Sequence, residues 1–325
     1  MVLKSICIVR HGSREKYGDV KVTEKKTFKD PINWRGPNGP DDQLTDIGRQ
    51  QARELADYLS SSHPEISAVY TSRHYRCLET VKPYAEMCER EGKAINFRLE
   101  MGLSEWQRID RKQARVPSIK QLRDYIPRLD AERQSHCDPL GHENPEEFYA
   151  RNAHFLANLI QSLDNDPNGP EAVLLCTSAS NIAWIARVLT GGCPENPTKH
   201  DFDIPAIGFY KFVRREVVPV EIDLEKRTPL GYLQVNWQNG VAIGGKWDIT
   251  HRADCTFLSS GTIMLWVPSD IPESLPPYEA LQMPKPSLPN FFDMGERNAE
   301  KAIAATIYTE TEATITATAV EVPAE

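Results

Sequence analysis

The residues Ser5-Ile6-Cys7-Ile8-Val9-Arg10-His11-Gly12 decide the expected fold of this chain. Residues 5–9 form a short apolar run that stops at a polar turn, which is the pattern of a buried strand. Open α/β sheets bind their ligands beyond the carboxyl ends of the parallel strands. The tripeptide Arg10-His11-Gly12 therefore stands where a binding loop is expected.

Each residue of this tripeptide suits phosphate chemistry. Arginine offers a bidentate fork to a phosphate group, and a neutral histidine can attack phosphorus. Glycine lets the backbone approach a phosphate closely. The tripeptide alone is a weak signal, since a turn with a solvated Arg and His has the same sequence, so the interpretation depends on the rest of the chain.

Strands and helices alternate in the hydrophobic pattern as far as about residue 215. A polar insertion rich in Arg and Pro interrupts the alternation and reaches about residue 144. The expected strands are 5–9, 68–71, 95–99, 172–176 and 207–213, and the expected helices are 44–61, 75–91, 146–163 and 182–189. This alternation predicts an α/β domain over residues 1–215, a three-layer sandwich with a mostly parallel sheet between helices.

The pattern changes after about residue 216. Leu233, Val235 and Trp237 alternate with polar residues, and Asn239-Gly240 predicts a β-hairpin because both turn positions need positive φ. Residues 216–267 are read as a β-rich segment that is too small for a core of its own and needs the first domain or a partner. Residues 268–325 are expected to be a Pro-rich linker followed by a disordered, acidic and Thr-rich tail.

Composition indicates a soluble, reduced, intracellular protein. The chain has 325 residues, with 46 acidic against 38 basic side chains and a net charge of −8. This balance argues against direct nucleic-acid binding, which depends on Lys and Arg. No apolar stretch approaches the roughly 20 residues that cross a bilayer. The seven cysteines, without a Cys-x-x-Cys pair, argue against a disulfide framework and a zinc site, and we expect neither metal nor cofactor.

Three further motifs open expected helices or follow expected strands. Leu44-Thr45-x-x-Gly48 begins the first helix, with Thr45 as its expected N-cap. The stretch from Ser72 to Thr80 begins the second helix and directs Arg76 to the sheet edge, where the helix dipole also favours an anion. The third motif, residues 102–106, presents Glu105 beside Trp106, a setting that favours a protonated carboxyl acting as a general acid.

In this order and spacing, the motifs resemble those of the histidine phosphatase (phosphoglycerate-mutase-like) superfamily. The resemblance implies a two-step phosphoryl transfer without a metal. His11 is then the nucleophile that becomes phosphohistidine, and Glu105 is the acid that protonates the leaving oxygen. Arg10, Arg76 and a second histidine neutralise the phosphoryl oxygens.

The chain departs from the family pattern at the second histidine, which is replaced by Ser178 in the sequence Thr177-Ser178-Ala179. A serine hydroxyl carries no charge and reaches less far. Loss of one preorganised donor to a developing oxyanion typically costs ~10²–10³ in turnover. We therefore expect a site that binds phosphate and turns over poorly, with His74 or Arg73 as candidate substitutes for the missing cation.

Fragments around residues 75–81, 102–106 and 173–183 are similar to one fungal branch of the superfamily, the phosphatase-domain tau subunits of transcription factor IIIC. That resemblance implies a nuclear protein whose β segment contacts other subunits of the complex. It also implies a degenerate phosphatase domain that serves assembly or holds a phosphate ligand. The alternatives are an active phosphatase on phosphopeptides or small phosphate esters, and a metabolic mutase, which needs the second histidine most.

The remaining conspicuous histidines, basic residues and tryptophans are expected to have structural roles. His136 and His142 lie in the insertion without a recognisable ligand spacing, which argues against a metal site. The basic run Arg108, Arg111, Lys112 and Arg115 is expected to be a solvated face. The tryptophans are expected in the core or at an interface, rather than as a stacking platform for bases; they are Trp237, Trp247 and Trp266.

Overall fold

The computed structural model describes residues 2–14, 43–61, 65–108, 117–131, 134–263 and 265–266. All of them lie within one compact unit, Met1–Tyr278. The expected linker and tail, residues 268–325, lie outside the described residues. So do Arg111, Lys112 and Arg115 of the basic run.

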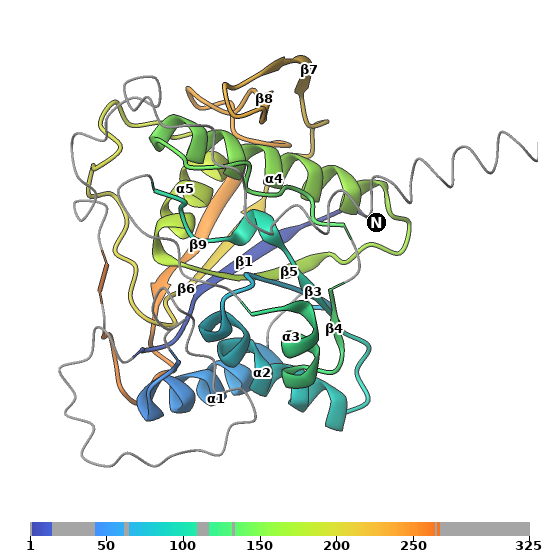
Figure 1. Cartoon of the computed structure of the whole chain (residues 1–325), viewed down its shortest axis with the longest axis vertical. Helices are drawn as coiled ribbons and strands as arrows, with labels where there is room; N and C mark the ends of the chain where they lie inside the picture. Colours follow the sequence, from blue (N-terminus) through green and yellow to red (C-terminus); the bar gives the residue numbers. More distant parts are fainter. Residues whose placement is uncertain are drawn as a thin grey trace, which may run out of the picture. The chain divides into compact units, whose positions relative to one another are not determined.

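A seven-stranded sheet forms the centre of the unit, in the order β4-β3-β2-β5-β1-β6-β9 (Figure 1). The strands β1 to β5 run parallel to one another, whereas β6 pairs antiparallel with both β1 and β9. The mostly parallel sheet is therefore confirmed. The strands are β1 (Ser5–Arg10), β2 (Ala68–Thr71), β3 (Asn96–Leu99), β4 (Leu129–Asp130), β5 (Ala172–Thr177), β6 (Phe209–Arg214) and β9 (Trp247–Asp254).

Helices cover both faces of this sheet, so the three-layer α/β sandwich is confirmed (Figure 1). Ile6 and Ile8 of β1 pack into the hydrophobic cluster on one face, and Cys7 and Val9 pack into the cluster on the other. Burial on both faces explains why the central strands read as continuous apolar runs. One face carries α4 (Pro145–Asn165) and α5 (Ala179–Thr190), and the other carries α1 (Asp46–Ser60), α2 (Tyr75–Arg90) and α3 (Ile119–Tyr125).

Capping residues determine where the helices begin and end. Thr45, the predicted N-cap, accepts the amide hydrogen of Gly48 at 3.0 Å with its side chain. Asn144 caps α4 in the same way, and a proline follows in the first turn, where its missing N–H costs nothing. The helix α5 ends at Gly191 with a φ of 72°, which glycine adopts without strain.

The segment after residue 216 packs on the first domain. Its strand β9 is an edge strand of the central sheet, next to β6. The strands β7 (Ile222–Arg227) and β8 (Leu233–Val235) form a small antiparallel sheet on the outer side of α4 (Figure 1). Tyr232 and Trp237 are buried in the same cluster as α4 and α5. The first domain therefore supplies the core that this segment lacks.

The expected hairpin around Asn239-Gly240 is wrong. The turn is present, with φ values of 58° and 78°, but β8 before it pairs with β7 and not with the residues after the turn. The amide of Gly240 instead donates to the carbonyl of Gly191 at 2.8 Å. The dipeptide thus turns the chain against the end of α5, and a local pattern does not distinguish this use from a hairpin.

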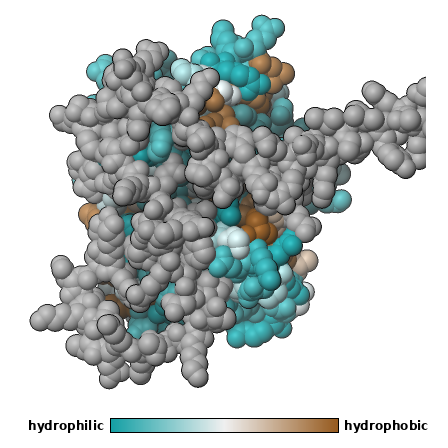
Figure 2. Space-filling model, viewed as in Figure 1, coloured by the Kyte–Doolittle hydropathy of each residue, from teal (hydrophilic) through white to brown (hydrophobic). Residues whose placement is uncertain are grey.

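The surface of the described part is mainly hydrophilic on the face shown in Figure 2, with small hydrophobic areas between polar side chains. Within the described ranges, no helix is long and apolar enough to span a membrane. The large apolar side chains that are exposed there are Val2, Val217, Val218, Leu224, Val241 and Leu265.

Candidate active site

The residues that follow β1 and β5 leave the sheet side by side. Arg10 is paired with Thr177 in the register of these parallel strands. The amide of His11 then donates to the carbonyl of Thr177 at 3.1 Å. His11 and Ser178 are therefore neighbours at the carboxyl edge of the sheet. Strand β2 lies on the other side of β5, which brings the start of α2 to the same edge.

Helix α2 holds the loop that carries His11. The amide of Gly12 donates to Thr80 Oγ1 at 2.9 Å. Glu79, the preceding residue, accepts the amide hydrogen of Leu44 at 2.8 Å and thereby holds the chain just before α1. The stretch after Arg76 in the sequence thus serves to position the neighbouring loops.

Helix α1 supports the same loop from a second direction. Thr45 donates its amide hydrogen to the carbonyl of Ser13 at 2.9 Å, and Gln51 accepts the amide hydrogen of Ser13 at 3.1 Å. Gly48 lies so close that a Cβ atom there would meet the carbonyl oxygen of Ser13 at 2.2 Å. The motif from Leu44 to Gly48 therefore packs directly against the loop after His11.

His11 is buried and neutral. Its Nδ1 lies 2.9 Å from the carbonyl oxygen of Gly12, which only accepts, so Nδ1 carries the proton and Nε2 the lone pair. Burial lowers the pKa of His11 well below its ordinary value, and the charges of Arg76, Arg10 and Arg14 lower it further. A neutral imidazole with a free lone pair is the form that attacks phosphorus.

Arg76 and Glu105 form an ion pair, with 2.9 Å between Nη2 and Oε2. Arg76 is buried at the start of α2, whereas the Glu105 side chain follows the short helix η2 (Met101–Leu103) and is 39% exposed. Burial alone raises the pKa of Glu105, but the attraction of the arginines, chiefly Arg76, outweighs burial and lowers it to about 2. Glu105 is therefore ionised at neutral pH.

The expectation that Trp106 keeps Glu105 protonated is therefore wrong. The ring of Trp106 stacks on Phe148 at 5.0 Å, and its Nε1 donates to the carbonyl of Glu143 at 3.0 Å, so this side chain belongs to the core. An anion that enters the site competes with Glu105 for Arg76. The pKa of the Glu105 carboxyl then rises, and the carboxyl can act as an acid.

Ser178 is buried at the N-cap of α5, with its Oγ 3.4 Å from the Oγ of Ser180. His74, a candidate substitute for the missing histidine, is also buried and lies at the N-cap of α2. Burial lowers the pKa of His74 to about 3, and Arg76 acts in the same direction. His74 is thus neutral in the free protein and adds no positive charge. The other candidate, Arg73, donates from Nε to the carbonyl of Pro117 at 2.8 Å.

The loop before Glu105 is held by residues that follow β5. Thr177 Oγ1 donates to the carbonyl of Leu103 at 2.7 Å. The side-chain amide of Asn181 donates to the same carbonyl and to that of Ser104, both at 2.8 Å. The element that carries Ser178 therefore also sets the position of the loop that carries Glu105.

The structure places Arg10, His11, Arg76, Glu105 and Ser178 at one edge of the sheet. Arg10 donates from Nη1 to the carbonyl of Ile204 at 2.7 Å, next to His11. Arg14, which was not predicted as a site residue from the sequence, acts with its charge on His11, His74 and Glu105. The signal was its position three residues after His11 in the same loop.

The tryptophans, histidines and basic residues for which the sequence predicted structural roles lie mostly in the core. Trp237 stacks on Tyr149 at 5.2 Å, and Trp247 is buried, so their core role is confirmed. Arg108 is buried too, 5.5 Å from the ring of Trp106, and its expected place on a solvated face is wrong. His136 pairs with Glu100 at 2.7 Å, and within the described ranges no three His, Cys, Asp or Glu side chains are grouped to hold a metal.

Comparison with known proteins agrees with this geometry. The transcription factor tau 55 kDa subunit of Saccharomyces cerevisiae is 29% identical over 276 residues, which cover 82% of this chain and 59% of the yeast protein. The ecdysteroid-phosphate phosphatase of Drosophila melanogaster is 24% identical, over 67% of this chain and 32% of that protein. The chain thus spans less than two thirds of the length of either relative.

A solved structure has the same fold. It is the "ecdysone phosphate phosphatase, EPPase, from Bombix mori in complex with tungstate", with a TM-score of 0.51 and 18% identity over 73% of this chain and 96% of that one. Residues 6–218 match the family model described as "Histidine phosphatase superfamily (branch 1)". This match covers β1 from its second residue, all of β2 to β6, and every residue of the candidate site. The chain belongs to the histidine phosphatase superfamily.

Proposed function

We propose that this chain is a subunit of a transcription factor IIIC complex, and that its phosphatase domain is degenerate and holds phosphate or a phosphorylated ligand with little turnover. The observation that carries the proposal is Ser178, an uncharged side chain beside His11 where the family has a second histidine. No metal or cofactor enters this proposal.

The charges at the sheet edge support phosphate binding. Arg10, Arg14 and Arg76 bring three positive charges close to His11, and Glu105 is the carboxylate paired with one of them. The N-termini of α2 and α5 meet the same edge, where the helix dipoles add partial positive charge. A phosphate dianion therefore finds more positive than negative charge there.

The same groups argue for slow turnover. Attack by His11 Nε2 moves negative charge onto the phosphoryl oxygens, and departure of the leaving oxygen requires a proton. Ser178 donates a hydrogen bond without a charge, His74 is neutral, and Glu105 is ionised in the free protein. The cation of the family pattern is thus not replaced by these side chains, and such a loss typically costs ~10²–10³ in rate.

The assembly role rests on the resemblance to the yeast tau subunit. We propose that residues 216–267 contact other subunits of transcription factor IIIC and that the protein works in the nucleus. Leu224 on β7 is 71% exposed and offers apolar surface for such a contact. The net charge of −8 is consistent with DNA contacts made by other subunits.

An active histidine phosphatase is the second candidate function, and the state of His11 favours it. A buried neutral histidine with its lone pair on Nε2 is prepared to form phosphohistidine. On this alternative, the substrates are phosphopeptides or small phosphate esters, and Ser178 is tolerated.

Hydrolysis of an aryl phosphate by wild type, His11→Ala, Ser178→His and the double variant separates the two candidates. We expect little wild-type turnover and at least a tenfold gain in Ser178→His, abolished in the double variant. The tenfold gain recovers part of the ~10²–10³ that one donor contributes. Clear wild-type turnover that disappears in His11→Ala supports the active phosphatase instead.

Two binding measurements test the remaining parts. Calorimetry with inorganic phosphate should show binding to wild type that is lost in Arg76→Met; equal binding by both refutes the phosphate site. The tagged full chain should recover other subunits of transcription factor IIIC from nuclear extract. Their absence in repeated captures refutes the assembly role.

A further inference from the structure

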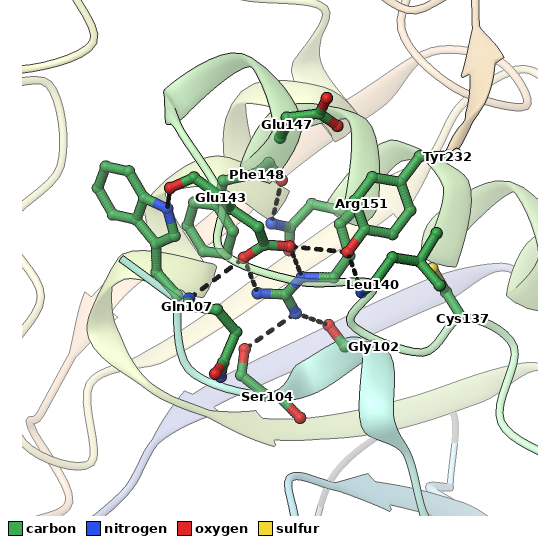
Figure 3. A network of polar contacts seen from close by, with 12 residues as sticks. Gly102, Ser104, Gln107, Cys137, Leu140, Glu143, Glu147, Phe148, Arg151 and Tyr232 are labelled. Atoms are coloured by element: carbon green, nitrogen blue, oxygen red, sulfur yellow. Dashed lines mark hydrogen bonds and ion pairs between the residues drawn. The ribbon is translucent and has the colours of Figure 1, made fainter. Parts of the chain in front are cut away.

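A fully buried ion pair lies behind the loop that carries Glu105. Glu143 and Arg151 both have 0% exposed side chains, and two bonds join them (Figure 3). Nε of Arg151 donates to Oε1 at 2.5 Å, and Nη2 donates to Oε2 at 3.0 Å. Such bidentate geometry fixes the plane of the guanidinium group, so Glu143 determines where the other N–H groups of Arg151 point.

Those remaining N–H groups hold the Glu105 loop. Nη1 of Arg151 donates to the carbonyls of Gly102 at 2.8 Å and Ser104 at 3.0 Å. Nη2 also approaches the carbonyl of Glu105 at 3.5 Å. All five guanidinium N–H groups thus have acceptors, three of which are carbonyl oxygens of this single loop.

The buried pair is completed by a residue of the C-terminal segment. Tyr232 donates its hydroxyl hydrogen to Oε1 of Glu143 at 3.0 Å, and its oxygen accepts the amide hydrogen of Leu140 at 2.8 Å (Figure 3). The side chain is fully buried. Tyr232 lies outside residues 6–218, so the family pattern does not include it.

The segment around Tyr232 is attached to α4 by further bonds. Thr228 donates from Oγ1 to Glu147 at 2.5 Å, and the amide of Leu230 donates to the same carboxyl at 3.0 Å. The residues just before the tyrosine are therefore anchored on α4. Without the Tyr232 hydroxyl, Glu143 keeps its two bonds from Arg151 and the bond from the amide of Gln107 to Oε2 at 3.2 Å, so the carboxylate loses one of the four bonds that hold it.

We propose that Tyr232 is a positioning residue of the phosphate site, acting through Glu143 and Arg151 on the loop that carries Glu105. The inference rests on the proposed phosphate site and extends it to a segment beyond the family domain. Hydrogen bonds in a buried network polarise and strengthen one another, so the loss of one member weakens the others. The placement of Glu105 against Arg76 then depends on the C-terminal segment.

The test compares Tyr232→Phe with Tyr84→Phe in the full chain. Both changes remove one buried hydroxyl and keep the ring; Tyr84 donates to the carbonyl of Ile66 at 3.3 Å, away from the Glu105 loop. Carbon-13 NMR of glutamate side-chain carboxyls, with Glu105 assigned by Glu105→Gln, follows the titration of Glu105, whose pKa is about 2, from pH 7 down to about pH 1.5. Hydrogen exchange of the amides of residues 102–105 is the second readout.

We expect the pKa of Glu105 to rise by at least about half a unit in Tyr232→Phe, because a looser loop weakens its pairing with Arg76. Exchange of the loop amides should accelerate at least threefold, and Tyr84→Phe should change neither. If Tyr232→Phe is merely less stable, with titration and exchange like those of Tyr84→Phe, the proposal is overturned. Calorimetry of wild type with inorganic phosphate separately shows whether the phosphate site itself fails.

Discussion

Thr80 Oγ1 accepts the amide hydrogen of Gly12 at 2.9 Å, and this bond ties helix α2 to the loop that carries His11. The same hydroxyl donates to the carbonyl of Arg76 at 2.8 Å, one helical turn earlier. The hydroxyl of Thr80 thus donates a hydrogen bond within α2 and accepts one from the loop that carries His11. The position of His11 relative to Arg76 depends on this contact.

Thr80→Val should destabilise the protein by about 1–3 kcal/mol, because the buried amide of Gly12 loses its acceptor while the side chain keeps its shape. Urea denaturation measures the loss. Thr80→Ser keeps the hydroxyl and is the matched control, expected to lose less than the valine variant. A larger loss in Thr80→Ser than in Thr80→Val would show that the methyl group matters more than the bond.

Gly48→Ala should also destabilise the protein, by about 1–3 kcal/mol, although alanine is the better helix former by about 1 kcal/mol. The reason is the carbonyl oxygen of Ser13, 2.2 Å from the site of the new Cβ atom. Gly192→Ala is the control, because its nearest neighbour, the Oγ1 of Thr190, is 3.6 Å away. A thermal melt in which Gly48→Ala is as stable as wild type would contradict the close approach.

The part of the fold that depends on local pattern was predicted well. The strand 68–71 agrees with β2 residue for residue, and the helix expected at 75–91 is α2 at Tyr75–Arg90. In these segments, continuous burial or a single apolar stripe makes the hydrophobic period unambiguous. The N-cap Thr45 was also predictable, because its capping bond joins residues within one helical turn.

Features that depend on distant residues were not predictable from the sequence. The strand β7 has exposed or half-buried residues throughout, so it lacks the alternation that marks a strand. Arg151 appears in the sequence as one polar residue of a helix, and its role depends on carbonyls almost 50 residues earlier. The ionisation of Glu105 likewise follows from Arg76 on another helix, not from its neighbour Trp106.

His74 should stay neutral under ordinary conditions, since burial lowers its pKa to about 3. In the unfolded chain its ordinary value is 6.5, so the unfolded state takes up the proton first. The free energy of unfolding therefore falls as the pH drops from 6.5 toward 3. His74→Asn should reduce this fall, with His11 still contributing in the same direction.

Urea denaturation between pH 7 and pH 5 measures this effect, and NMR of the His74 ring follows its charge directly. His200→Asn, at a side chain that is 55% exposed, is the control for removing a histidine. A His74 resonance that titrates between pH 7 and pH 5 would contradict the neutral state and would revive this residue as a substitute for the missing cation.

Glu105→Gln should lower stability at pH 6 by at most about 1 kcal/mol, because the carboxyl is partly exposed and solvent screens its pairing with Arg76. The pKa of Glu105 is about 2 in the folded protein, against an ordinary value of 4.5, so the stabilisation is complete above 4.5 and is lost as the pH falls toward 2. The gap between wild type and variant should therefore narrow in urea denaturation at pH 6, 4.5 and 3.5. Glu65→Gln, at a side chain that is 66% exposed, is the control for removing a carboxylate. A stability difference that stays constant over this range would mean that folding does not lower the pKa of Glu105.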